Sequence, residues 1–379
     1  MSKQIALAAL AAVALAACSE TGGMPMGPHS AASLAARITA DAAADGSAPG
    51  AVYALTNRIS GNAVAVFRRA ADGTLVAAGS VATGGAGTGS GLGSQGALAL
   101  SDDGRWLFAV NAGSNEVSAF RVGPAGLSLT SRVGSGGTRP ISLTVHGSLL
   151  YVLNGGGDGN ISGFTVGADG VLAAIRGSSR VLSGAAVGPA QVAFSSDGRW
   201  LVVTEKTTNQ LDLYAVGPDG MATGPTSYAS AGGTPFGFGF GHRDELFVSE
   251  AAGSASSYVL GGSGGLTAVS GAVATHQGAP CWLVVTKDGR FAYTANAQGA
   301  SISGFAVGTD GSIDLIDADG ITASVNRGNT DLALSVDSRY LYQLDGTSIF
   351  GFRVQADGHL APVGTVVGLP AGTVGLVAH

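Results

Sequence analysis

The sequence predicts an all-β protein: a seven-bladed β-propeller with four-stranded antiparallel blades, spanning residues 50–379. Three observations lead to this fold class. An aromatic residue returns at a nearly constant spacing, short apolar strands alternate with Gly-containing hairpin turns, and the two ends of the range match neighbouring strands of one blade. A repeat of about 40–50 residues made of several short strands is typical of propeller blades.

The aromatic repeat sets the number of blades. Each aromatic residue closes a short strand, often of the form Asn-x-Ile-x-x-Phe, and the mean spacing is 47.5 residues. The seven positions are Phe67, Phe120, Phe164, Tyr214, Tyr258, Phe305 and Phe352. Residues 50–379 therefore have room for seven units of this length.

Tight turns are expected between the first and second strands of the blades. Asp-Gly between two apolar runs is a hairpin signal, because Gly adopts positive φ without a steric penalty. Three copies stand at Asp103-Gly104-Arg105, Asp197-Gly198-Arg199 and Asp288-Gly289-Arg290. Such turns, and strands with one bare face, account for 63 Gly residues in the chain.

The two ends of the repeat region complement each other. Residues 370–379 resemble a first strand, and residues 51–57 resemble a second strand. We therefore expect the C-terminus to supply the innermost strand of the first blade. This pairing would close the ring and leave no open sheet edge.

Composition excludes two other classes of protein. Only 12% of the residues are charged and 45% are apolar, which is too apolar for an intrinsically disordered chain. The net charge is −6, and no basic cluster is present that could bind nucleic acid. We expect a monomer that does not bind nucleic acid.

The N-terminus predicts export and lipid anchoring. Residues 1–17 combine Lys3 with a short apolar run, as in a secretory signal peptide, and the run is too short to span a membrane. The sequence Leu-Ala-Ala-Cys resembles the bacterial lipobox, which predicts acylation of Cys18. By the same resemblance, Ser19 favours the outer membrane of the cell envelope. Residues 18–49 are predicted to form a flexible tether.

The repeat, with Tyr-Val-Leu-Asn at 151–154 and Asn-Ile-Ser-Gly-Phe at 160–164, resembles the seven-bladed lactonase family. That family includes propeller-type 6-phosphogluconolactonases and the fungal carboxymuconate cycloisomerase. The resemblance covers residues 50–379. It implies a polar active site at one end of the central channel, with Pro-Arg-His at the start of one innermost strand and a Glu that follows Asn at the end of the next strand.

The positions that match this pattern can be assigned in two ways. Counting blades places Pro-Arg-His at residues 235–237 and the acid at Glu250. Local similarity places them at residues 188–191 and at Glu205. In both assignments a Glu is present and the Arg-His pair is absent.

A ring of polar residues is expected at one mouth of the channel, where second strands end and first strands begin. The second-strand ends are Asn57, Asn111, Asn154, Glu205, Glu250, Asn296 and Asp345. These side chains either cap their own loops as Asx turns or line a polar pocket. In the second case, the ligand-binding candidates are Gln191, Asn111, Asn154, Asn296 and Asp345.

Four residues at this mouth are the candidates for chemistry. Glu205 or Glu250 would act as a general base on water, and Lys206 or Arg139 would stabilise the oxyanion. An ordinary surface salt bridge is the alternative role for Lys206. The first functional hypothesis is thus a lactonase of the cell envelope, and a small-molecule lactone is its substrate.

The second hypothesis is a non-catalytic envelope propeller that binds a small ligand or a protein partner at the same mouth. We expect no cofactor and no metal, since the six His residues lack ligand spacing. Gly91–Gly96 matches a dinucleotide-binding pattern, but no helix follows it, so the match is interpreted as chance.

Overall fold

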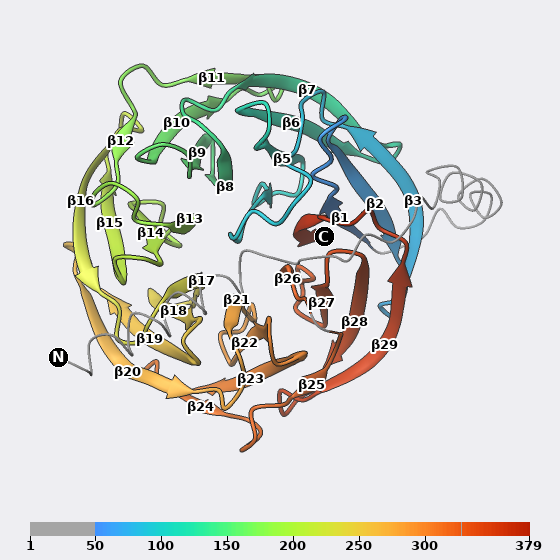
Figure 1. Cartoon of the computed structure of the whole chain (residues 1–379), viewed down its shortest axis with the longest axis vertical. Coiled ribbons are helices and arrows are strands. Elements are labelled where there is room, and N and C mark those ends of the chain that lie inside the picture. The colour runs from blue at the N-terminus through green and yellow to red at the C-terminus, as the bar shows by residue number, and fades with distance from the viewer. Residues whose placement is uncertain (1–49, 327) are drawn as a thin grey trace.

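The computed structural model describes residues 50–326 and 328–379. The predicted signal peptide, Cys18 and the tether lie outside these residues. Seven antiparallel sheets stand around a central channel (Figure 1). The described residues contain no helix, and therefore none that is long and apolar enough to cross a membrane. The prediction of a seven-bladed propeller is confirmed.

The blades are numbered here in chain order, and the strands of each blade are given from the channel outward. Blade 1 contains β30 (Val374–Ala378), β1 (Gly50–Leu55), β2 (Ala63–Arg69) and β3 (Leu75–Ala82). Blade 2 contains β4 (Leu98–Leu100), β5 (Trp106–Asn111), β6 (Glu116–Gly123) and β7 (Gly126–Gly134). Blade 3 contains β8 (Pro140–His146), β9 (Leu149–Asn154), β10 (Asn160–Val166), β11 (Leu172–Ala174) and β12 (Arg180–Val181).

The other four blades repeat this plan. Blade 4 contains β13 (Pro189–Phe194), β14 (Trp200–Glu205), β15 (Gln210–Val216) and β16 (Ala222–Ala229). Blade 5 contains β17 (Pro235–Phe240), β18 (Glu245–Glu250), β19 (Ser254–Leu260) and β20 (Leu266–Ala274). Blade 6 contains β21 (Pro280–Val285), β22 (Phe291–Asn296), β23 (Ser301–Val307), β24 (Ile313–Leu315) and β25 (Ala323–Ser324). Blade 7 contains β26 (Asp331–Leu334), β27 (Tyr340–Leu344), β28 (Ser348–Val354) and β29 (Leu360–Val367).

Two blades depart from the four-stranded plan. In blades 3 and 6 the outermost strand is divided into two short segments, and both segments pair with the same third strand. The inner layers are unaffected, so the channel is still surrounded by seven equivalent units.

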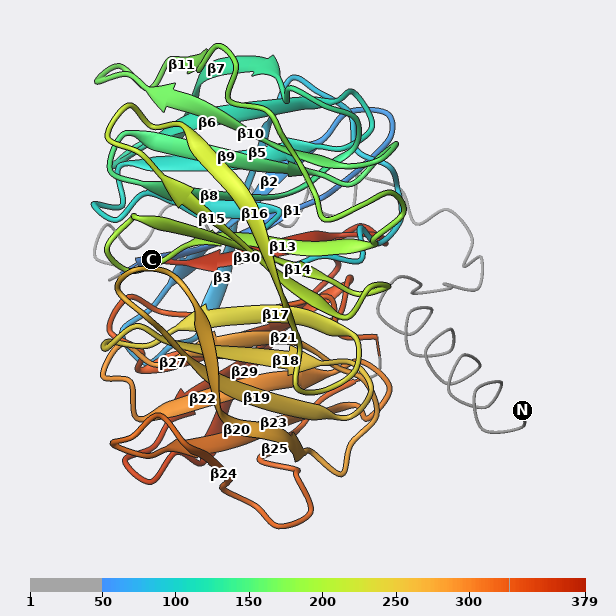
Figure 2. The same cartoon turned by 90° about the vertical axis from the view of Figure 1, so that its left-hand side faces the viewer.

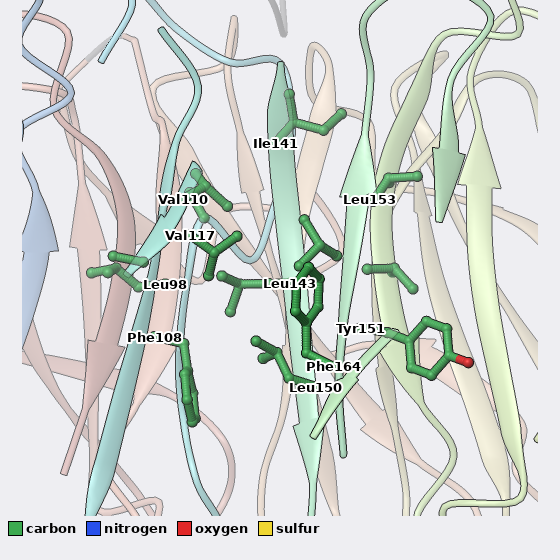
Figure 3. Packing of buried hydrophobic residues seen from close by; sticks show 14 of the residues in the cluster. Leu98, Phe108, Val110, Val117, Ile141, Leu143, Leu150, Tyr151, Leu153 and Phe164 are labelled. Atoms are coloured by element: carbon green, nitrogen blue, oxygen red, sulfur yellow. The ribbon is translucent and has the colours of Figure 1, made fainter. Parts of the chain in front are cut away.

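The core lies between neighbouring blades. All six residues of β5 are buried, whereas β3 alternates between half-buried and exposed residues because its outer edge faces solvent. Phe108 of blade 2 and Leu143 and Phe164 of blade 3 belong to one buried cluster, whose labelled side chains fill the space between strands in Figure 3. The seven aromatic residues that repeat in the sequence are all buried on third strands.

Several glycines are required where one blade meets the next. A Cβ on Gly170 would lie 2.1 Å from the Trp106 ring, and one on Gly264 would lie 2.4 Å from the Trp200 ring. The equivalent turn of blade 4 receives a hydrogen bond: the Tyr151 hydroxyl donates to the Gly220 carbonyl at 2.7 Å. Large side chains on a second strand therefore pack against bare turns of the following blade, as the Gly content indicates.

The ring closes through the two ends of the described chain. β30 pairs with β1 in antiparallel register, with Val52 opposite Ala378, and the His379 amide donates to the Ala51 carbonyl at 2.7 Å. In Figure 2, β30 lies within the stack of blades. The predicted closure by the C-terminal strand is confirmed.

Candidate site at the channel mouth

First-strand starts and second-strand ends meet at one mouth, as expected. Pro189 is opposite Glu205, Pro235 is opposite Glu250, and Pro280 is opposite Asn296. The opposite mouth carries the Asp-Gly-Arg turns, in which Asp103 accepts hydrogen bonds from the Ser101 hydroxyl at 2.6 Å and the Arg105 amide at 3.0 Å. These aspartates are explained by turn geometry alone.

The asparagines at the second-strand ends point into their own blades. Asn57 donates to Thr88 and to the Ser90 carbonyl, and the other three donate their side-chain amides to a serine on the third strand. The three bonds join Asn111 to Ser118 at 2.8 Å, Asn154 to Ser162 at 3.1 Å and Asn296 to Ser303 at 2.9 Å. All three asparagines are fully buried. These bonds hold the second and third strands of each blade together.

Glu250 occupies the same place in blade 5. Its carboxylate accepts hydrogen bonds from the Ser256 hydroxyl at 2.6 Å, the Gly232 amide at 2.7 Å and the Ser230 hydroxyl at 3.1 Å. Ser254 donates to its other oxygen. The carboxylate is fully buried with these partners, so its charge is stabilised inside the blade.

Glu205 takes this place in blade 4 and faces a second acid. Its carboxylate accepts hydrogen bonds from the Ser183 amide at 3.0 Å and the Thr208 hydroxyl at 2.6 Å. Asp212 stands at the third-strand position that holds serine in blades 2, 3, 5 and 6. Burial raises the pKa of Asp212 to about 7, and the adjacent Glu205 carboxylate adds to this rise.

The remaining ligand-binding candidates also have structural partners. Asp345 is half-buried and accepts bonds from the Thr347 and Ser348 amides, as an Asx turn does. Gln191 forms two bonds with Phe238 of the next blade: its amide donates to the Phe238 carbonyl at 3.0 Å, and its oxygen accepts from the Phe238 amide at 2.8 Å. Gln191 therefore ties blade 4 to blade 5.

Lys206 is the predicted residue that faces the mouth. Its ammonium donates to the Gly93 carbonyl at 2.5 Å and lies 5.1 Å from the centre of the Phe236 ring. Burial lowers the pKa of Lys206 to about 7, and the nearby Arg139 charge acts in the same direction. Within residues 50–326 and 328–379, neither Lys206 nor the exposed Arg139 forms an ion pair. The alternative of a surface salt bridge at Lys206 is thus not supported.

The loop Gly91–Gly96, whose match to a dinucleotide-binding pattern was interpreted as chance, lies at the same mouth. Gly91–Gly96 does not bind a nucleotide phosphate through a helix; it runs into β4, and Figure 1 shows the chain reaching from blade 2 into the middle of the ring. We call Gly91–Gly96 the plug. Its residues Leu92, Ser94 and Gln95 are buried.

The plug is held by three other blades. The Ser94 hydroxyl donates to the Ile141 carbonyl of blade 3 at 2.8 Å, and the Gln95 amide donates to the Ala190 carbonyl of blade 4 at 3.1 Å. From blade 6, the Trp282 indole donates to the Ser94 carbonyl at 3.0 Å. A sequence signal for this role existed, because residues 83–97 form a connection that is long for a compact domain.

The floor beneath the plug is apolar where the resemblance implies Arg and His. Phe236 is fully buried and packs edge-on against Trp282, with ring centres 5.2 Å apart. A Cβ on Gly237 would lie 2.1 Å from the Gln95 side-chain oxygen. Gly237 therefore leaves the space that Gln95 fills.

The fold and this mouth define a seven-bladed propeller whose channel is closed on one side by its own loop. Residues 53–187, which span β1 to the end of blade 3, match the model of the family described as "Lactonase, 7-bladed beta-propeller". This match confirms the family resemblance for about a third of the chain. A comparison with curated proteins by sequence finds no match.

Solved structures share the whole fold at low sequence identity. A candidate 6-phosphogluconolactonase of Bacteroides fragilis has 19% identity and a TM-score of 0.69, with 89% of this chain and 99% of that chain covered. The periplasmic gluconolactonase of Pseudomonas aeruginosa has 20% identity and a TM-score of 0.65, with 85% and 98% covered. A protein from Lactobacillus plantarum has 18% identity and a TM-score of 0.70, with 87% and 99% covered. At these identities the likeness establishes the fold.

Proposed function

We propose that this protein is a lactonase-family propeller of the bacterial cell envelope that binds a small carboxylated ligand at Lys206 and Arg139. One observation carries the proposal: two cations lie near each other at the mouth, and neither forms an ion pair among the described residues. Two like charges in a partly desolvated site repel each other, and an anion placed between them removes that cost.

The surroundings favour a carboxylate on a compact organic ligand. Lys206 supplies a point charge and Arg139 supplies a planar group that suits a carboxylate. Phe236 and Trp282 offer an apolar surface beside them. Lys206 and Arg139 together carry two positive charges, which one carboxylate can bridge. Carboxylated lactones and the hydroxy acids formed from them combine both features.

Hydrolysis of a lactone is the second candidate function. It is supported by the family match of residues 53–187 and by the pKa of about 7 at Lys206, since an amine near neutrality can accept a proton from water. In this scheme Lys206 replaces Glu205 and Glu250 as the general base, and Arg139 faces the oxyanion. The two glutamates already accept hydrogen bonds from Ser183 and Gly232, in the connections that precede their blades.

The test measures ligand binding at the mouth. Titration calorimetry with carboxylated lactones, their hydroxy acids and neutral lactones is run on the parent and on Lys206→Met, which keeps the chain length but removes the charge. Lys287→Met is the control, because Lys287 is exposed beside a turn at the opposite mouth. We expect carboxylated compounds to bind the parent and Lys287→Met and to bind Lys206→Met at least about tenfold more weakly. Equal binding by all three proteins would refute the site.

The envelope location is proposed from the N-terminal sequence. The apolar run before Leu-Ala-Ala-Cys supports export and acylation of Cys18, and a periplasmic protein is among the proteins of similar fold. Mass spectrometry of the N-terminal peptide from membrane fractions tests it. An acylated Cys18 at the mature N-terminus is expected, and an unmodified Cys18 would contradict the anchor.

A further inference from the structure

We propose that the plug is a gate: Gly91–Gly96 closes the mouth over Lys206 and leaves it to admit a ligand. The proposal goes beyond the binding function above, because it concerns access to the Lys206 amine and holds whatever the ligand is. It rests on the position of the plug, on the kind of contacts that hold it and on the backbone of two of its glycines.

The plug lies between Lys206 and the opposite wall of the channel. On one side its Gly93 carbonyl accepts the Lys206 ammonium at 2.5 Å. On the other side the Gln95 side chain reaches Leu283 of blade 6, donating to its carbonyl at 2.7 Å and accepting from its amide at 2.9 Å. Any molecule that approaches Lys206 along the channel from this mouth therefore meets the plug.

The plug is held by the packing of Leu92 into the core and by separate hydrogen bonds, and not by a strand ladder. The structure assigns no strand to residues 83–97, whereas β13 and β17 each pair with the second strand of their blade. Isolated hydrogen bonds contribute little each and can be exchanged for bonds to water or ligand one at a time. A segment held in this way opens more readily than the strands around it.

The bond to Lys206 links opening to an anion. A carboxylate accepts a hydrogen bond from an ammonium more strongly than a neutral carbonyl does. A carboxylated ligand at Lys206 would take the place of the Gly93 carbonyl, so binding and plug release favour each other. The buried ammonium is then matched by a full negative charge.

Two glycines of the plug have the backbone that a hinge requires. Gly93 in its middle and Gly96 at its end have φ values of 65° and 84°, a region that glycine adopts without a steric penalty. Outside the plug the chain is fixed by Asn57, whose side chain donates to the Ser90 carbonyl at 2.6 Å. Movement is thereby confined to the few residues that cover Lys206.

A second glutamine, Gln191, serves as the control for a merely structural role of Gln95. Gln191 forms the same two bonds with Phe238 that Gln95 forms with Leu283, but Gln191 belongs to a strand. Removing either glutamine leaves one backbone amide and one carbonyl without these partners. Only removal of Gln95 loosens the plug.

The experiment measures labelling of lysines in the purified full-length chain by trinitrobenzenesulfonate, with peptide mapping by mass spectrometry. Lys287, which is exposed, is the internal reference. We expect Gln95→Ala to raise the labelling rate of Lys206 about tenfold, because two bonds that hold the plug are lost. Lys287 should be unaffected, and Gln191→Ala should leave the Lys206 rate at the parent value. An unchanged Lys206 rate in Gln95→Ala, or an equal rise in both variants, would overturn the gate.

Hydrogen exchange on the parent gives a second test that needs no variant. The amides of Ser94 and Gln95 should exchange faster than those of Val192 and Ala193 in β13, although both sets are near the channel. Equally slow exchange of the two sets would show that the plug is a permanent part of the fold and would overturn the proposal.

Discussion

Gln95 binds both backbone groups of Leu283 across the channel, 188 residues away in the chain. The innermost strand of a blade has no neighbouring strand on its channel side, so its N–H and C=O groups that face the channel need other partners. A glutamine side chain carries an NH2 donor group and a carbonyl acceptor side by side, so it can pair with both the C=O and the N–H of one backbone residue. Gln191 meets Phe238 in the same way between blades 4 and 5.

These two clamps should contribute measurably to stability. Gln191→Ala and Gln95→Ala each leave a buried amide and a buried carbonyl unsatisfied, which costs about 1–3 kcal/mol. Urea unfolding monitored by fluorescence would measure the loss. Gln210→Ala, at a less buried position at the start of β15, is the matched control and should change the free energy of unfolding by less than about 0.5 kcal/mol. Equal values for clamp and control variants would contradict this account.

The carboxyl pair of blade 4 should make stability depend on pH. The pKa of Asp212 is raised from 3.8 to about 7, so the folded state binds a proton that the unfolded state has released between these pH values. Stability should therefore fall as pH rises from about 4 to 7 and then stay level with respect to this group. Asp212→Asn keeps the shape and should remove this part of the dependence, with a gain of about 1 kcal/mol or more at neutral pH.

Two other groups with shifted pKa values, Asp331 and Lys206, also make stability depend on pH. The free energies of unfolding of the parent and the variant must therefore be compared. The raised pKa of Asp331, about 8, acts in the same direction as that of Asp212. The lowered pKa of Lys206, about 7, makes stability rise between about pH 7 and 10.5. The free energy of unfolding is measured against pH for the parent and for Asp212→Asn. The difference between the two curves isolates the contribution of the Glu205–Asp212 pair. A difference that does not vary between pH 4 and 7 would show that Asp212 is ionised throughout.

The two glutamates should behave as structural groups. In Glu250→Gln an amide nitrogen replaces an oxygen that accepts from serine hydroxyls and an amide, so we expect a loss of about 1–3 kcal/mol in stability. Glu205→Gln should have a smaller effect, because it also removes the repulsion with Asp212. Ligand affinity at the mouth should match the parent in both. A 10²–10⁴-fold loss of lactone turnover at unchanged stability would instead support a general base.

Removal of the last strand should open the ring. Deleting residues 374–379 takes away β30 and leaves the channel side of β1 without a partner. It also removes the Leu376 amide that donates to Asp331 at 3.0 Å. We expect a loss of several kcal/mol out of a typical 5–15 kcal/mol, seen as a large drop in Tm. An unchanged Tm would mean that the ring does not depend on this strand.

The architecture could be predicted because its signals are local and repeated. A buried aromatic such as Phe120 on each third strand, and a turn such as Asp103-Gly104-Arg105, act within a few residues of their own position. Seven copies reinforce each other, so the number of blades and the closing strand follow from spacing. The divided outer strands of blades 3 and 6 did not follow, because nothing in their local pattern separates them from continuous strands.

The sequence by itself determined the seven blades, the closure by β30 and the mouth at which Lys206 and Arg139 lie. Only the tertiary structure decided that Glu205 and Glu250 turn into their blades, where Ser183 and Gly232 of the preceding connections supply donors. It also decided that Gly91–Gly96 is a plug, since its partners come from three other blades. The direction of a side chain and the role of a loop depend on groups brought together from distant parts of the chain, and no local pattern encodes them.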